Sequence, residues 1–242
     1  MTSALVRKLE CYLPLSDVDR AGLEALQFKF HSIAAKSEVE AILPAGGAVH
    51  QIQTGYACRY RQLPDGRRQI SGLMIPGDFI DLRKFVVTGA EHGVFGLTEL
   101  ALMGYDAASL LRVLEARPRS AQAVWRALLA EESIAQEWLV SLGKRSALER
   151  VAHLICELYV RHTVMNEGAG RTFTLPITQR EIGDAMGLST VHVNRTLREL
   201  RQRGLAKLQS GQMEILNFEK LADLAMFSPT YLQFRNRTAN RH

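Results

Sequence analysis

The sequence has few of the residues that build disulfide frameworks or metal clusters. Its 242 residues include only three cysteines, Cys11, Cys58 and Cys156, which are far apart and odd in number. This count excludes a disulfide scaffold, a C-x-x-C redox pair and a cysteine-rich zinc or iron–sulfur site. We therefore expect a protein of the reducing cytoplasm with no metal site and no cofactor.

Long hydrophobic runs are also missing. No apolar run reaches the roughly 18 residues that a membrane span needs. The N-terminal stretch MTSALVRKLECYLPLSD lacks the apolar region of a secretory signal. We expect no membrane partner and a cytoplasmic location.

An excess of one charge is absent from the first part of the chain and present in the second. Residues 1–143 contain 15 Lys or Arg and 16 Asp or Glu, whereas residues 144–242 contain 15 and 9. A basic C-terminal part favours contact with a polyanion. A solvated basic surface without a partner is the alternative.

The first large segment, residues 25–112, has short β-type runs separated by turns that contain Gly and Pro. This pattern is typical of a sandwich or a small barrel. The clearest runs are residues 40–43, 57–63, 69–75 and 94–97. A short amphipathic stretch, residues 6–12, precedes them.

The next segment predicts one long helix over residues 119–143. Pro118 suits a helix start, and neither Gly nor Pro follows before Gly143. Apolar or small side chains form two stripes at helical spacing. One stripe is Ala121, Val124, Leu128, Ala135, Trp138 and Leu142, and the other is Trp125, Leu129 and Leu139. We predict that one stripe packs on the β-domain and the other on the same helix of a second copy. A single wide core face is the alternative.

Gly143 predicts a hinge after this helix. Residues 146–162 then predict a further amphipathic helix, and residues 166–170 a loop.

The most specific pattern begins at Thr178, which forms a capping box with Glu181 at the start of a short helix. Gly187 ends that helix, and Ser189 caps a second one that Gly204 closes. A helix, a turn that contains glycine and a second helix predict a helix-turn-helix.

The second helix has a buried stripe and an exposed face. The predicted buried stripe is Val193, Leu197 and Leu200. The exposed face has polar residues near its N-terminal end, the end that a recognition helix inserts into the major groove. The candidate DNA-binding residues are Thr178, Arg180, Ser189, Thr190, Val191, His192, Asn194, Arg195 and Arg198. Arg195 is the candidate for bidentate contact with guanine O6 and N7, and Asn194 for contact with adenine or phosphate. Residues 205–208 and 213–216, joined by Ser210 and Gly211, predict a hairpin that lies along the phosphate backbone as a wing.

The stretch TQREIGDAMGLSTVHVNRTLRELRQRGL, which begins at Thr178, resembles the winged-helix domain of the Crp/Fnr regulators, the relatives of the cyclic-AMP receptor protein. The order of the segments fits that family. The resemblance implies an α+β fold with a sensor domain over residues 1–117, a β-roll (jelly-roll) like a cyclic-nucleotide-binding domain. A long dimerisation helix over residues 118–143 and a winged helix-turn-helix DNA-binding domain over residues 144–242 follow. It implies a transcription regulator, not an enzyme, that binds double-stranded DNA at a palindromic site as a homodimer and contacts RNA polymerase.

Two departures from the family affect the expected ligands. Its recognition helix usually has a Glu four residues before the Arg, where this sequence has Val191 before Arg195, so the DNA site is expected to differ. After PGDFI (residues 76–80), Leu82 and His92 take the approximate places of the Glu and Arg that hold the ribose and phosphate of a cyclic nucleotide. A buried phosphodiester without a guanidinium is poorly compensated. We predict that cyclic AMP does not bind tightly, and the sequence identifies no other effector.

Other functions have weaker support. The candidate haem or metal ligands are isolated along the chain: His31, His50, His92 and Cys58. With no H-x-H pair among them, they disfavour a cupin-like metalloenzyme. Cys11 alone does not form the cysteine cluster of Fnr-type oxygen sensors. A redox switch at Cys58 or Cys156 has little support, because neither cysteine has a neighbour in the sequence that would lower its thiol pKa. A ligand-binding regulatory β-roll protein that does not bind DNA would not need the helix pair, the wing or the basic C-terminal part.

Overall fold

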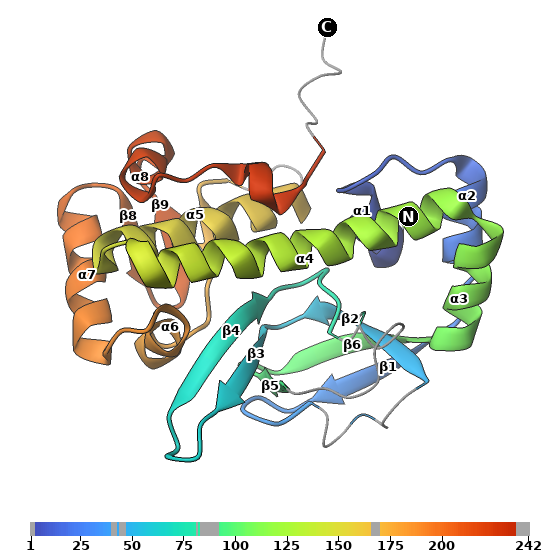
Figure 1. Cartoon of the computed structure of the whole chain (residues 1–242), viewed down its shortest axis with the longest axis horizontal. Helices are drawn as coiled ribbons and strands as arrows, with labels where there is room; N and C mark the ends of the chain where they lie inside the picture. Colours follow the sequence, from blue (N-terminus) through green and yellow to red (C-terminus); the bar gives the residue numbers. More distant parts are fainter. Residues whose placement is uncertain are drawn as a thin grey trace, which may run out of the picture.

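The computed structural model describes residues 3–39, 43, 47–80, 82, 92–165 and 170–235. A β-roll, one long helix and a helical C-terminal region follow one another along the chain (Figure 1). This is the predicted α+β architecture. The predicted strand over residues 40–43 and the predicted loop over residues 166–170 lie almost wholly outside the described residues.

In the described part of the chain, the β-roll has two antiparallel sheets of three strands. One sheet has the order β1-β6-β2 and the other β4-β3-β5. The strands are β1 (Phe28–Ile33), β2 (Ala48–Thr54), β3 (Ala57–Gln62), β4 (Arg68–Met74), β5 (Gly93–Gly96) and β6 (Leu100–Asp106). Alternating side chains of both sheets form the apolar interior, including Ile52 and Leu102 from one sheet and Met74 and Val94 from the other.

Three helices flank the roll: α1 (Ala4–Glu10), α2 (Asp17–Glu24) and α3 (Ala107–Ala116). The expectation of β structure up to residue 112 is wrong from residue 107 onward. There, the Asp106 carboxylate accepts a hydrogen bond from the Ser109 backbone N–H at 2.8 Å and caps α3. The buried Leu110 then anchors the helix to the core.

The long helix α4 (Pro118–Lys144) runs along much of the molecule (Figure 1). The face that it packs on α1 includes the buried Ala123, Val124, Ala127 and Ala130, whereas Trp138 is buried in the core that contains residues of α5. The second stripe is open, with Trp125 62%, Leu129 57% and Leu139 70% exposed. The first stripe needs one correction, because Ala135 is exposed. The predicted position of the hinge is also wrong. Gly143 lies inside the last helical turn, and the backbone turns at Arg145 instead.

The C-terminal region begins with α5 (Ala147–Met165) and contains a small sheet of order β7-β9-β8. Its elements are β7 (Thr172–Thr174), α6 (Gln179–Met186), α7 (Thr190–Gln202), β8 (Ala206–Gln209), β9 (Gln212–Ile215), α8 (Phe218–Ala225) and the 3-10 turn η2 (Pro229–Leu232). The buried residues of this region form one continuous core with Cys58, Ile70 and Leu73 of the roll.

A buried chain of charges joins distant elements. The Asp78 carboxylate, just after β4, pairs with Lys8 of α1 at 2.7 Å and with Arg161 of α5 at 2.5 Å. Arg161 also pairs with Glu157 at 2.9 Å, and Glu157 accepts a hydrogen bond from the Trp138 indole of α4 at 2.9 Å. Burial raises the pKa of Asp78, but the two cations outweigh it and hold this pKa well below its usual range. The network ties the roll, the long helix and the C-terminal region together.

Candidate DNA-binding surface

The first helix of the candidate site, α6, begins with the predicted capping box. The Thr178 hydroxyl accepts from the Glu181 backbone N–H at 3.2 Å, and the Glu181 carboxylate accepts from the Thr178 backbone N–H at 2.6 Å. Lys36 of the roll pairs with Glu181 at 2.5 Å. Burial raises the pKa of Glu181, but these partners outweigh it and lower this pKa below its usual value. The start of α6 is therefore fixed both locally and by the β-roll.

Two glycines make the sharp corner between α6 and α7. Gly187 ends α6 with φ of 63°, a left-handed conformation that glycine adopts readily. A Cβ atom on Gly183 would lie 2.4 Å from the Leu188 carbonyl oxygen, so only glycine permits this close approach. The predicted helix-turn-helix corner is thus present.

The second helix, α7, is held by one face. Ser189 caps it by accepting from the His192 backbone N–H at 3.3 Å. Val193 and Leu200 are fully buried, and Thr196 joins them on the same face. Leu197, predicted as part of this stripe, is half-buried.

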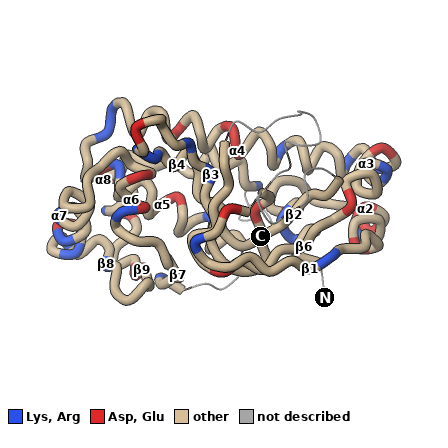
Figure 2. The backbone as a smooth tube through the Cα atoms, turned by 90° about the horizontal axis from the view of Figure 1, so that it is seen from below, with Lys and Arg blue, Asp and Glu red and all other residues tan. Residues whose placement is uncertain are grey.

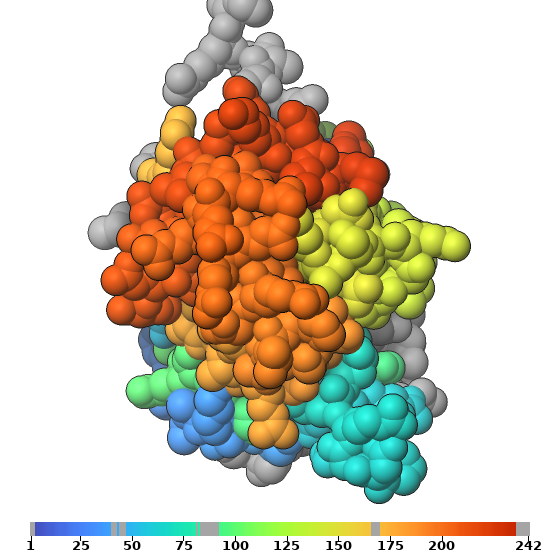
Figure 3. Space-filling model, turned by 90° about the vertical axis from the view of Figure 1, so that its left-hand side faces the viewer, coloured from blue at the N-terminus to red at the C-terminus, as the bar shows by residue number. Residues whose placement is uncertain are grey.

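All nine candidate residues are exposed, and the structure brings them together at the start of α6 and along α7. Figure 3 faces this end of the molecule and shows the orange segment that includes α7 uncovered. The hydroxyls of Thr178 and Ser189 are already engaged in capping. Among the described residues, the Arg195 guanidinium has no hydrogen-bonding or ion-pairing protein partner, so it is available to an external acceptor.

The surroundings of α7 are basic. Arg198 and Arg201 are exposed on the same helix, and Figure 2 shows Lys and Arg along this end of the molecule. Arg203 is partly neutralised by Glu199, which it meets at 2.5 Å. Cations spaced along an exposed helix suit the phosphates on both sides of a major groove.

The wing adds Lys207, which is not among the nine candidate DNA-binding residues. Strands β8 and β9 pair in register around a turn at Ser210 and Gly211, with φ of 51° and 73°. Lys207 lies opposite Glu214 in this hairpin. The Ser-Gly turn signalled the hairpin in the sequence, but a single Lys on a short strand gave no signal of its own.

The isolated histidines and cysteines do not form a further centre. His31 and His50 meet edge to face with ring centroids 5.3 Å apart, whereas His92 is exposed. Across the described ranges, no three His, Cys, Asp or Glu side chains gather as metal ligands would. Burial raises the pKa of both Cys58 and Cys156 to about 12, which keeps these thiols protonated at neutral pH.

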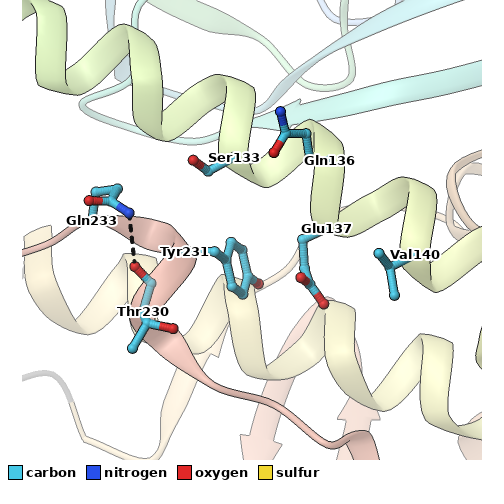
Figure 4. A pocket seen from close by; sticks show the side chains of 7 residues that line it. All are labelled: Ser133, Gln136, Glu137, Val140, Thr230, Tyr231 and Gln233. Atoms are coloured by element: carbon cyan, nitrogen blue, oxygen red, sulfur yellow. Dashed lines mark hydrogen bonds between the residues drawn. The ribbon is translucent and has the colours of Figure 1, made fainter.

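A shallow hollow of about 370 Å³ lies between α4 and η2 (Figure 4). Glu137 and Val140 contribute to it from α4, and Thr230, Tyr231 and Gln233 from the C-terminal side. The Glu137 carboxylate is already paired with Arg145 at 2.7 Å. The charge of Glu137 is thus compensated by Arg145 within the chain. Because α7 carries exposed arginines, its surface remains the better candidate for binding an anion.

In the part of the chain that the structure describes, no helix has the length and apolar character of a membrane-spanning segment.

A β-roll, a long helix and an exposed recognition helix with a basic surface define a DNA-binding regulator of the winged helix-turn-helix class. The family profile "Crp-like helix-turn-helix domain" matches residues 149–224. Transcriptional activator protein FnrL of Cereibacter sphaeroides is 30% identical over 181 residues, which cover 73% of this chain and 72% of FnrL. The chain belongs to the Crp/Fnr family of transcription regulators, and it is a DNA-binding regulator of that type.

Two further relatives agree. Nitrogen fixation regulation protein FixK of Bradyrhizobium diazoefficiens is 29% identical over 177 residues, or 73% of each chain. The structure of FixK2 from Bradyrhizobium japonicum matches with a TM-score of 0.72 and 25% identity, covering 84% of this chain and 100% of FixK2. The implied family and fold are confirmed.

Proposed function

We propose that two copies of this chain bind a palindromic DNA site, each inserting the N-terminal half of α7 into the major groove. The observation that carries this proposal is the exposed Arg195 on the second helix of the corner, which has no partner in the part of the chain that the structure describes. Arg195 contacts a guanine, and Asn194 contacts an adenine or a phosphate. The other contacts come from Thr178, Arg180, Ser189, Thr190, Val191, His192 and Arg198. Lys207 of the wing reaches the phosphate backbone.

The open stripe of α4 supports the homodimer. Trp125, Leu129, Leu139 and Val140 leave a row of apolar surface that the described residues do not cover. We infer that the helix over residues 118–143 contacts the same helix of the second copy. Along the chain, this helix follows a sensor domain (residues 1–117) and precedes a DNA-binding domain (residues 144–242). A two-fold dimer presents its recognition helices roughly 34 Å apart, which matches half-sites one helical turn apart.

FnrL is named a transcriptional activator protein. This name supports contact between our protein and RNA polymerase when the protein is bound to DNA. We infer that it acts in the cytoplasm, where that DNA and polymerase lie, and that it regulates by binding and catalyses no reaction.

We infer that cyclic AMP is not the effector. Leu82 is fully buried and apolar, and His92 is exposed, so neither supports a buried ribose phosphate as Glu and Arg do. Titration calorimetry with cyclic AMP is expected to give no low-micromolar binding. Low-micromolar affinity would contradict this inference.

Replacement of Arg195 tests the proposed function. Operator DNA is first selected from random sequences with the purified protein. We expect Arg195→Ala to weaken binding to the selected DNA by about 1–3 kcal/mol and to relax the preference at one base position. Arg112→Ala, which removes an exposed Arg of α3, is the matched control and is expected to bind as the wild type does. Equal binding of selected and random DNA by the wild-type protein would contradict the proposed reading of a base sequence, because binding through phosphates alone does not distinguish sequences.

A further inference from the structure

The recognition helix has one apolar side chain on its outward face. Val191 is 78% exposed, whereas Val193 and Leu200 of the same helix are fully buried. A single exposed valine on a protein surface is ordinary. Its position makes it informative, because residues four apart lie on the same side of a helix and Val191 precedes Arg195 by four.

The neighbours of Val191 leave its methyl groups open. Ser189 holds the His192 ring at the start of the helix, with its hydroxyl 3.1 Å from Nδ1 of that ring. Valine has one strongly preferred side-chain rotamer in a helix. Its two methyl groups therefore stand at a fixed place beside the Arg195 side chain, and little side-chain entropy is lost when they are covered.

The chemistry of the major groove restricts what such a group can recognise. Valine neither donates nor accepts a hydrogen bond, and facing guanine O6 or cytosine N4 would desolvate those atoms without a partner. The apolar group that base pairs present in this groove is the 5-methyl group of thymine. Four residues of helix rise by ~6 Å, which places Val191 one or two base pairs from the guanine that Arg195 contacts.

We propose that Val191 determines base specificity by packing on the 5-methyl group of a thymine in each half-site, beside the guanine contacted by Arg195. The inference rests on the proposed function, because it requires α7 to lie in the major groove. A carboxylate at this position would instead accept from cytosine, so this residue sets a thymine preference.

The test removes the thymine methyl group from the DNA and the Val191 side chain from the protein in separate experiments. In the selected operator, each symmetric pair of thymines is replaced in turn by deoxyuridine, which lacks only the 5-methyl group. The loss of one buried methyl contact weakens binding by about fourfold, so both half-sites together give about fifteenfold. We expect this loss at one thymine pair with the wild-type protein and less than a twofold loss with Val191→Ala. Val18→Ala removes a valine of α2 that is 68% exposed and is expected to keep the wild-type response.

Two results would overturn the inference. Either no thymine pair shows the methyl effect, or the effect persists undiminished in Val191→Ala. If Arg195→Ala still weakens specific binding in that case, the proposed function stands and only the role of Val191 is wrong. If the wild-type protein selects no DNA sequence, the proposed function and this inference fail together. As a second readout, selection with Val191→Glu is expected to replace the thymine by cytosine, and an unchanged thymine would contradict the inference.

Discussion

Asp78 shows how one residue acquires a role that its local sequence does not indicate. It follows Pro76 and Gly77 in a turn that resembles the approach to a nucleotide pocket, yet its carboxylate is buried between Lys8 and Arg161. These partners lie 70 and 83 residues away in the sequence. Two cations offset the cost of burying this carboxylate, and Arg161 thereby connects the roll to α5.

Arg161 is the residue on which this network depends most. We expect Arg161→Ala to lower the free energy of unfolding by about 3–5 kcal/mol, because it leaves Asp78 and Glu157 without their shared cation. Urea unfolding followed by circular dichroism measures the change. Arg161→Lys restores the charge but not the forked geometry and is expected to recover part of the loss. A loss below 1 kcal/mol in Arg161→Ala, no larger than that of an exposed Arg112→Ala, would show that the network does not stabilise the fold.

At the scale of elements, the open stripe of α4 makes the dimer testable. We expect Leu129→Glu combined with Leu139→Glu to give a monomer, because association would bury charges without partners. The two leucines are 57% and 70% exposed in the single chain, so its own fold is expected to change little. Sedimentation velocity measures the state. Leu111→Glu on α3, where the leucine is 39% exposed, is the control and is expected to remain a dimer. A double variant that sediments as the wild type does would contradict the assigned contact.

The elements differ in how far the sequence alone predicts them. The corner between α6 and α7 is predicted well because Thr178, Glu181, Gly187 and Ser189 act on backbone groups within a few residues. The candidate residues of α7 follow from helical spacing, and the structure shows all nine site residues exposed at the start of α6 and along α7. Their contacts with DNA stay a prediction.

Other elements depend on packing that no local pattern reveals. The sequence does not predict helix α3, because one capping carboxylate, Asp106, ends the strand and starts the helix without a Gly or Pro. Ala135 is predicted on the covered stripe but is exposed, because alanine fits a covered and an open face equally well. Gly143 predicts a break two residues before the backbone turns at Arg145, because a helix tolerates glycine when its neighbours hold it.

At the scale of the whole molecule, the continuous core between the roll and the C-terminal region makes stability depend on pH. His153 and His162 lie in this core, and burial, with Arg145 and Arg161 nearby, lowers the pKa of each to about 4. Below the unfolded value of 6.5, the unfolded chain binds protons that the native histidines do not. The stability that these neutral histidines contribute is therefore complete above that value and is lost as the pH falls from there toward 4.

A comparison with His153→Gln isolates this effect from carboxylates such as Glu157, whose pKa burial raises and which act in the opposite direction. Between pH 7 and pH 5, we expect the wild type to lose about 2 kcal/mol of unfolding free energy more than the variant does. Urea unfolding at both pH values gives the four free energies. Equal losses in the two proteins would show that His153 is protonated in the native state as readily as in the unfolded chain.

Guanine methylation interference measures whether two α7 helices enter successive major grooves of one DNA site. Methylation of guanine N7 blocks the acceptor that Arg195 contacts. We expect strong interference at guanines in two symmetric clusters about 10 base pairs apart, and none of that interference with Arg195→Ala. Binding that is insensitive to guanine methylation, or interference at a single cluster, would contradict this expectation.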